Sequence, residues 1–265
     1  MLYSSRMTTI LDDSANSAPL VIDPELEAMM EAGVHLGHSR SRRNPGMTPY
    51  LWGVRNNVEI IDLAKTKEHL DIALAFLRQL AGERKMILFV GTRPSSRDLL
   101  RKTADALGFP WVAERWIGGA LTNFRVVRKR VEILEGLEYE KATGGFEKYP
   151  KKEQMQKEKE IAKLTRNFDG LRRLTRLPDA VVIVDIVHDD LALREARRLK
   201  VPVVALTDTN TDPRLVQYPI PANDDARTAV SFMLDRMAAA IRDGMRTADQ
   251  QTPAPAANQG TAQEA

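Results

Sequence analysis

Cysteine is absent from all 265 residues of the chain. Disulfide frameworks, zinc–thiolate fingers, iron–sulfur clusters and thiol nucleophiles are therefore excluded together. Long apolar runs are also missing, since no stretch approaches the roughly 18 consecutive apolar residues that a membrane span requires. The N-terminus lacks the basic-then-apolar plan of a secretory signal. These absences predict a soluble protein without thiol chemistry.

Strong net charge is also lacking, because the formal total is only +3. The chain nevertheless carries 39 lysines and arginines, spread unevenly along its length. Local charge of this kind matters more for the choice of partner than the sum does. With 43% hydrophobic residues, the chain can bury a full core, and its length predicts one main domain plus an elaboration.

Residues 84–108 predict a strand–turn–helix unit. Residues 86–90 are apolar without alternation, as is typical of a central parallel strand that helices cover on both faces. The turn at 91–96 contains neither the three-glycine dinucleotide pattern nor the Lys-Ser/Thr ending of a phosphate loop. It either only shapes the connection or presents Arg93 and Arg97 to an anion.

The remaining pattern predicts an α/β fold with a parallel sheet. Strands are expected at 109–112, 180–184, 201–206 and 218–220, and helices at 24–33, 65–82, 190–199 and 226–243. A β-hairpin is predicted over 50–62 with its turn at Asn56-Asn57, after an irregular exposed loop over 33–53. The polar, aperiodic segments 1–20 and 245–265 predict a disordered leader and a disordered tail.

The sequence between residues 122 and 176 has a different pattern. Apolar residues repeat at steps near three and four on both sides of Gly144-Gly145, which predicts an antiparallel helical hairpin with a coiled-coil seam. The hairpin would be inserted into an α/β domain formed by 21–121 and 177–244. Its outer faces are rich in lysine and arginine, but interspersed glutamates suit a merely solvated coiled coil equally well.

Several side chains have more than one possible use. His35 and His38 could ligate a metal, but no cysteine or nearby carboxylate completes a set, which favours packed or hydrogen-bonded histidines, and we assign no metal ligand. Asp208 and Asp212, after the strand at 201–206, could bind a cation or serve as turn acids. Trp116 could stack on a nucleic-acid base or pack at a domain hinge.

Seven runs of the sequence, in collinear order, resemble the bacterial form of the small-ribosomal-subunit protein family numbered two. The runs are GVHLGH (33–38), NPGMTPYLWGVRNNVEIIDLAKT (44–66), ILFVGT (87–92), RWIGGALTNF (115–124), LPDAVVIVD (177–185), VPVVALTDTNTDP (201–213) and IPANDDA (220–226). The resemblance extends over residues 31–244. It implies a flavodoxin-like α/β domain with helices on both faces and a protruding coiled coil.

The resemblance also implies a function. Members of this family are structural constituents of the cytoplasmic ribosome that contact small-subunit ribosomal RNA and neighbouring ribosomal proteins. In bacteria they help to dock the large multi-OB-repeat ribosomal protein, which helps to recruit messenger RNA. From this we expect no catalytic residue, no cofactor, no small-molecule substrate and no membrane partner.

The expected RNA-facing residues come from three considerations. The resemblance, carried over position by position, nominates Arg40, Arg42, Arg43, Arg55, Asn56, Arg115 and Asn123. The possible anion turn adds Arg93 and Arg97, and the basic start of the helical hairpin adds Arg125, Arg128 and Lys129. Arginine and lysine at these positions would displace counterions from phosphate, while the sheet would fix their geometry.

Two other functions fit parts of the pattern. A nucleotide- or phosphosugar-handling enzyme could use Arg93, Asp185, His188 and Asp208 at the strand ends, but the chain lacks a glycine-rich phosphate motif and a Ser-His-Asp elbow. A generic coiled-coil adaptor would bind only protein. Nucleotide titration set against RNA binding over a salt series separates the three, because only the ribosomal protein predicts a steep salt dependence.

Overall fold

Unbroken apolar runs form the central sheet of the structure, a computed structural model that describes residues 23–251. Strands β4 (Ile87–Val90), β6 (Ala180–Ile183) and β7 (Val203–Thr207) are buried at every residue. With β5 (Trp111–Val112) and β8 (Tyr218–Pro221) they form a five-stranded parallel sheet of order β5-β4-β6-β7-β8. In chain order this is the 2-1-3-4-5 arrangement of flavodoxin-like folds, so the predicted parallel α/β sheet is confirmed.

Helices cover both faces of this sheet. One core lies under α2 (Leu63–Gly82), α3 (Arg97–Leu107) and α7 (Arg227–Gln251). The other lies under α6 (Asp190–Arg198) and the sheet-proximal ends of α4 (Phe124–Ala142) and α5 (Lys151–Phe168). Successive residues of β4 alternate between the two cores, because neighbouring side chains of a strand point to opposite faces.

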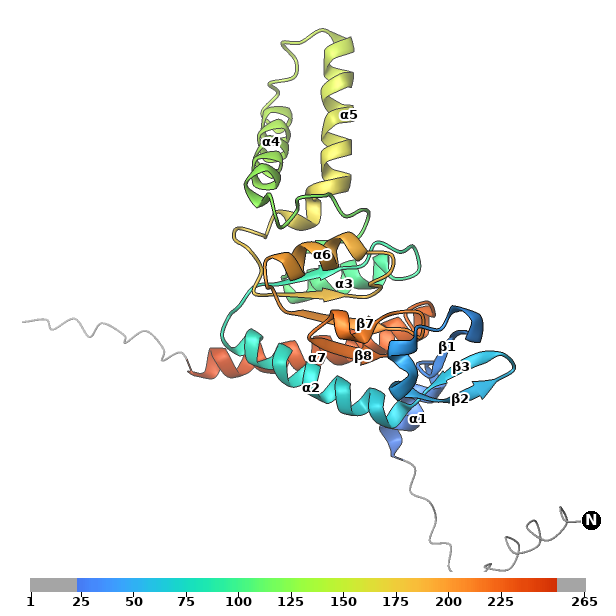
Figure 1. The fold of residues 1–265 in the computed structure, drawn as a ribbon. Coiled ribbons are helices and arrows are strands. Elements are labelled where there is room, and N and C mark those ends of the chain that lie inside the picture. The colour runs from blue at the N-terminus through green and yellow to red at the C-terminus, as the bar shows by residue number, and fades with distance from the viewer. Residues whose placement is uncertain (1–22, 252–265) are drawn as a thin grey trace, which may run out of the picture.

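A smaller antiparallel sheet packs beside α1 (Pro24–Glu31) at one end of the molecule (Figure 1). Its strands β1 (Leu36–Ser39), β2 (Leu51–Arg55) and β3 (Val58–Ile61) have the order β1-β3-β2. The predicted hairpin is confirmed, with Asn56 and Asn57 in the left-handed region at φ 50° and 63°.

The predicted irregular loop over 33–53 is partly wrong. Residues 36–39 form β1, and short 3-10 helices occupy η1 (Arg40–Arg42) and η2 (Pro45–Tyr50). Strand β1 is only four residues long and pairs with β3 through an irregular register. A pairing this short and irregular leaves no alternating pattern in the sequence from which it could have been predicted.

Helices α4 (Phe124–Ala142) and α5 (Lys151–Phe168) extend side by side away from the sheet (Figure 1). We call this pair the arm. Its base is anchored by Val127, Leu164 and other buried residues of the second core. The apolar pattern predicted a return helix beyond Leu171, but α5 ends at Phe168 and a 3-10 turn, η3 (Asp169–Leu171), follows. Gly170 in that turn packs against Trp111 more closely than a side chain would allow.

The last helix, α7, is longer than predicted. Its expected end near Asp243 is wrong, because the helix continues to Gln251 and buries Ala248. Gly244 lies against the backbone of Arg78 in α2, so this glycine permits close packing of two helices. The predicted leader over 1–20 and the rest of the predicted tail lie outside the described residues. Within residues 23–251, no helix has the length and apolar composition needed to cross a bilayer.

Candidate functional site

The carboxyl ends of the parallel strands carry a buried cluster of acids around one arginine. Asp185, Asp208 and Asp224 are each nearly fully buried. The Arg93 guanidinium lies 2.9 Å from a carboxylate oxygen of Asp185 and 3.4 Å from one of Asp224, and it also pairs with Asp225. Arg93 is thus neutralised by the protein itself, which leaves little of its charge for an external anion.

Burial controls the ionisation of this cluster. Burial away from water raises the pKa of Asp224 to about 9, and the neighbouring negative charges of Asp185 and Asp208 raise it in the same direction by smaller amounts. Burial also raises the pKa of Asp189, although this carboxylate accepts hydrogen bonds from the Thr92 backbone N–H at 3.0 Å and the Thr92 hydroxyl at 2.7 Å. The acids at this edge therefore act mainly on one another and on residues of the first strand–helix connection.

His38 joins the cluster from the small sheet. Its ring nitrogens lie 3.2 Å from a carboxylate oxygen of Asp208 and 3.4 Å from one of Asp225. The hydrogen bond with Asp208 raises the pKa of His38, against the effect of burial. One ligand atom from each of the three residues falls within 4.8 Å of the others. The two acids lie at different ring nitrogens of His38, so the contacts form a bridge from Asp208 through the imidazole to Asp225.

The two histidines therefore do not form a pair. His35 stays apart from His38, and burial lowers its pKa. Asp208 faces His38, whereas Asp212 accepts a hydrogen bond from the backbone N–H of Arg214 at 3.1 Å and opens the turn η4 (Pro213–Leu215). Of the two predicted uses, Asp212 has the turn-forming one, whereas Asp208 accepts a hydrogen bond from the backbone N–H of Thr209 and pairs with His38, and its use as a cation ligand stays a prediction.

The four residues of the possible enzyme site are only partly assembled. Arg93, Asp185 and Asp208 belong to the buried cluster. His188 is exposed, and its backbone N–H, rather than its ring, donates to Asp185 at 2.9 Å. The arrangement offers acids that neutralise an arginine and surround a possible ion, but no base poised beside a nucleophile among these residues.

The twelve predicted RNA-facing residues occupy three places. Arg40, Arg42, Arg43, Arg55 and Asn56 lie on the small sheet and its turns. Arg93 and Arg97 lie where β4 leads into α3. Arg115, Asn123, Arg125, Arg128 and Lys129 lie at the base of the arm. No single site contains all of them.

Four of these cations already have acidic partners. Besides Arg93, the acids are Glu59 at 3.5 Å from Arg43, Glu114 at 3.1 Å from Arg97, and Glu132 at 3.6 Å from Arg128. Glu59 is only 1% exposed. Arg43 therefore compensates a buried carboxylate as well as facing solvent.

The other six cations are exposed and have no ion pair within the part of the chain that the structure describes. They are Arg40, Arg42, Arg55, Arg115, Arg125 and Lys129. Asn56 sits at the tip of the β2–β3 turn, and Asn123 precedes α4 without capping it through its side chain. Unpaired exposed cations are the groups that phosphate can neutralise at the lowest desolvation cost.

The sequence did not indicate the residue that orients the arm-base loop, residues 114–123. Glu195 on α6 accepts hydrogen bonds from the Trp116 ring at 3.1 Å, from the backbone N–H groups of Gly119, Leu121 and Thr122, and from the Thr122 hydroxyl. Trp116 is buried in this network, so of its two predicted alternatives the packed one is confirmed. The only signal for Glu195 was a charge beside the apolar Ala192 and Ala196 on one face of a helix.

An exposed apolar pocket beside the small sheet was also missed. It has a volume of about 390 Å³, and its lining includes Met30, Leu36, Trp52 and Ile60. The Trp52 side chain is 77% exposed. Exposed aromatic and aliphatic side chains gathered around a hollow are typical of a protein–protein contact.

Comparison with known proteins gives consistent matches over most of the chain. A family model described as ribosomal protein S2 matches residues 29–244. Proteins named small ribosomal subunit protein uS2 from two strains of Thermus thermophilus are each 44% identical over 215 residues, which cover 81% of this chain and 84% of the relative. The protein of that name from Coprothermobacter proteolyticus is 43% identical over 219 residues, with 83% and 82% coverage.

Proposed function

The chain belongs to the ribosomal protein S2 family, and from that premise we propose that its exposed, unpaired cations bind small-subunit ribosomal RNA. Its role is structural, in translation, and its place is the small ribosomal subunit. The family is one of ribosomal structural proteins, so the enzyme alternative at Arg93, Asp185, His188 and Asp208 falls away. The acid cluster then serves to join the small sheet to the main sheet.

One observation carries the RNA proposal. Six of the predicted residues, Arg40, Arg42, Arg55, Arg115, Arg125 and Lys129, expose a cationic group without an ion pair in the described range 23–251. Each such group can neutralise a phosphate and release a counterion, which favours binding without sequence preference. The paired residues Arg43, Arg93, Arg97 and Arg128 contribute less, because binding RNA would require them to leave or share their acids.

The position of these cations suggests how the protein holds RNA. We infer that residues 122–176 are a coiled-coil insertion into an α/β domain made of 21–121 and 177–244. Arg40 and Arg42 lie near the small sheet, whereas Arg125 and Lys129 begin the arm. Two basic regions on one stiff body would contact separate RNA segments at once, so each raises the effective concentration of the other.

A pair of charge reversals tests the RNA contact. Changing Arg40 and Arg42 together to glutamate should weaken incorporation into small subunits without lowering thermal stability, since neither has an ion pair among the described residues. Arg43→Glu should lower stability, because it leaves the buried Glu59 beside a like charge. Co-sedimentation in sucrose gradients and thermal melts would measure both. Unchanged co-sedimentation of the double variant would count against this loop.

The Trp52 pocket supports the second part of the proposal, the docking of a neighbouring ribosomal protein. We assign this contact to the large multi-OB-repeat ribosomal protein, because Met30, Leu36 and Trp52 offer the exposed apolar anchors that a protein partner uses and RNA phosphate does not.

Trp52→Ala tests the docking assignment. The substitution should leave stability unchanged, since the side chain is mostly exposed, and should weaken binding of the multi-OB-repeat protein to purified small subunits by about tenfold or more, the loss typical of an aromatic anchor. Ribosomal RNA binding should not change. Val54→Ala is the matched control on the same strand, because Val54 is exposed but does not line the pocket. Equal binding by both variants would remove the pocket from the proposal.

A further inference from the structure

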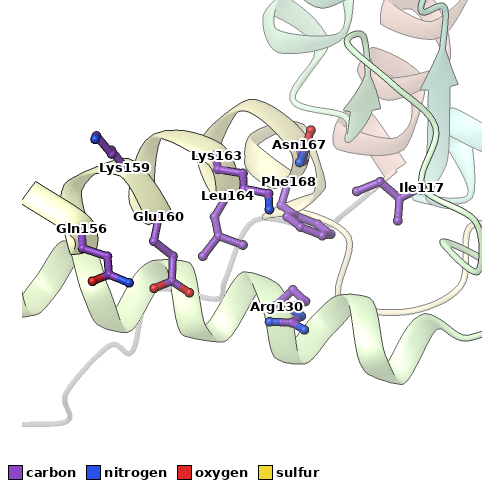
Figure 2. A pocket seen from close by; sticks show the side chains of 9 residues that line it. All are labelled: Ile117, Arg130, Gln156, Lys159, Glu160, Lys163, Leu164, Asn167 and Phe168. Atoms are coloured by element: carbon purple, nitrogen blue, oxygen red, sulfur yellow. The ribbon is translucent and has the colours of Figure 1, made fainter.

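A groove lies between the two helices of the arm, on the side facing the arm-base loop (Figure 2). Its volume is about 490 Å³, which falls within the roughly 300–1,000 Å³ of sites that hold small organic ligands. Leu164 and Phe168 of α5 and Ile117 of the loop supply its apolar lining. Figure 2 shows these three side chains bordering one space together with Arg130 of α4.

The polar residues around this lining are mostly cationic or amide-bearing. They are Arg130, Lys159, Lys163, Gln156 and Asn167, with Glu160 as the single acid. Three positive groups against one negative group give the groove a positive field, and its concave shape concentrates that field.

Several cations elsewhere on the same helices form ion pairs with glutamates of the arm. Lys141 pairs with Glu158 at 2.8 Å and Lys157 with Glu140 at 3.0 Å. Arg128 pairs with Glu132 on α4. By contrast, Arg130, Lys159 and Lys163 have no ion pair with any described residue. Other cations of the arm, such as Lys129 and Lys151, are also unpaired among the described residues but lie outside the groove, so what distinguishes these three is that they border a hollow with an apolar lining.

We propose that this groove binds one unstacked nucleotide of RNA. The inference rests on the proposed ribosomal RNA binding and names a site for it on the arm. Arg130 and Lys163 neutralise the flanking phosphates, and the base and ribose lie against Leu164 and Phe168. The Asn167 amide, next to Phe168 in the chain, offers both a donor and an acceptor to the base edge, whereas Gln156 lies about three turns away along α5. An RNA duplex would use the cations but could not place a base in the hollow, whereas a bulged or looped nucleotide uses both.

The experiment compares three forms of RNA with the full-length chain and two groove variants. The probes are a short single-stranded RNA of mixed sequence, a paired RNA duplex and complete small-subunit ribosomal RNA. The variants are Arg130→Gln and Asn167→Asp, which change charge at the rim without altering the buried lining. Lys151→Gln is the control, since Lys151 is an exposed cation of α5 outside the groove.

Arg130→Gln should bind the single strand about tenfold more weakly, as expected for loss of a hydrogen bond to a charged group. Asn167→Asp should lose about as much, because it replaces an amide donor by a carboxylate that repels phosphate. Arg130→Gln should also reduce the slope of binding against salt by about one. Duplex binding should change no more than in Lys151→Gln. Ultraviolet crosslinking of assembled subunits should attach a nucleotide to the peptide that contains Phe168.

The outcomes separate this inference from the function on which it rests. If the wild-type chain binds no ribosomal RNA, the proposed function fails and the groove assignment fails with it. If wild type binds but both groove variants match Lys151→Gln on the single strand, only the groove assignment is overturned. The groove assignment is also overturned if the variants lose binding to polyglutamate while keeping RNA, because the groove would then be a site for an acidic protein.

Discussion

Glu195 determines the course of the arm-base loop over 114–123. Its carboxylate is only 6% exposed and accepts five hydrogen bonds from this loop. Burial by itself would raise its pKa, but the backbone N–H groups of Thr122 and Gly119, with the Trp116 ring, outweigh burial and hold the pKa of Glu195 below its usual value. The charged form is therefore the one that stabilises the fold.

Glu195→Ala should lower the free energy of unfolding by about 3 kcal/mol or more. Several buried N–H donors would be left without an acceptor, at about 1–3 kcal/mol each. Because the pKa is lowered by folding, wild type should lose this contribution as the pH falls below about 4.5. Glu195→Gln keeps one acceptor oxygen and should lose less, without that pH dependence. Urea unfolding at neutral and acid pH measures both variants.

A matched surface substitution controls for the loss of a carboxylate. Glu132→Ala removes an exposed acid that pairs with Arg128 at 3.6 Å, and should change stability by no more than about 0.5 kcal/mol. If Glu195→Ala were no more destabilising than Glu132→Ala, the five hydrogen bonds would not anchor the loop.

Individual polar contacts could not be predicted from the sequence. His38 and Asp208 are 170 positions apart, and only the packing of the small sheet on the main sheet brings them within 3.2 Å. The exposed arginines at 40, 42 and 55 were recognised as basic, but which cations had acidic partners depended on side-chain geometry. Arg43 and Arg93 carry the same charge as Arg40, and their neighbours give them different roles.

Elements with a strong apolar signal were predicted well. The runs that became β4, β6 and β7 have no polar side chain before their last residues, as expected for strands with helices on both faces. The end of α7 and strand β1 were misjudged for a common reason. Each is stabilised by a distant element, α2 for the end of α7 and β3 for β1, so no local pattern marked it.

The tip of the arm contains a local ion cluster that can be tested as an element. Glu140 lies 3.0 Å from the Lys157 ammonium and 3.2 Å from that of Lys148, and it accepts a hydrogen bond from the Tyr149 hydroxyl at 3.0 Å. The bonds to Lys157 and then Lys148 lower the pKa of Glu140 to about 2. A lowered carboxyl pKa stabilises the tip above about pH 4.5, and the contribution fades as the pH falls toward about 2.

Glu140→Gln should loosen the tip without affecting the sheet. Backbone amides of residues 143–149 should exchange hydrogen faster than in wild type near neutral pH, and the difference should shrink at about pH 3, where the wild-type interaction weakens. Exchange in β4 and β6 should not change. Glu153→Gln is the control on α5, because Glu153 is exposed and has no ion pair with the described residues. Equal exchange rates in the Glu140→Gln and Glu153→Gln variants would show that the ion pairs of Glu140 do not stabilise the tip.

At the scale of the whole molecule, the architecture separates stability from binding. The two cores that hold the sheet are closed by α2, α3, α6 and α7 together with the base of the arm. The outer part of the arm, residues 139–159, supplies no residue to either core. The predicted ribosomal identity, structural role and location are confirmed by the family match, whereas the RNA contacts and the insertion boundaries stay predictions.

Removing residues 139–159 and joining the helices by a short turn tests this separation. Val131, Leu134 and Leu164 remain to close the second core, so the thermal unfolding midpoint should stay close to that of the intact chain. RNA affinity should fall only partly, because Arg40, Arg125 and the other cations outside the deletion remain. The small sheet and the arm base also stay on one body, so binding of RNA at one still raises the effective concentration of RNA at the other. Filter binding across a salt series and thermal melts measure the two effects. A deleted chain that fails to fold would show that the outer arm belongs to the core, and one that binds RNA with full affinity would confine the contact to the α/β domain and the arm base.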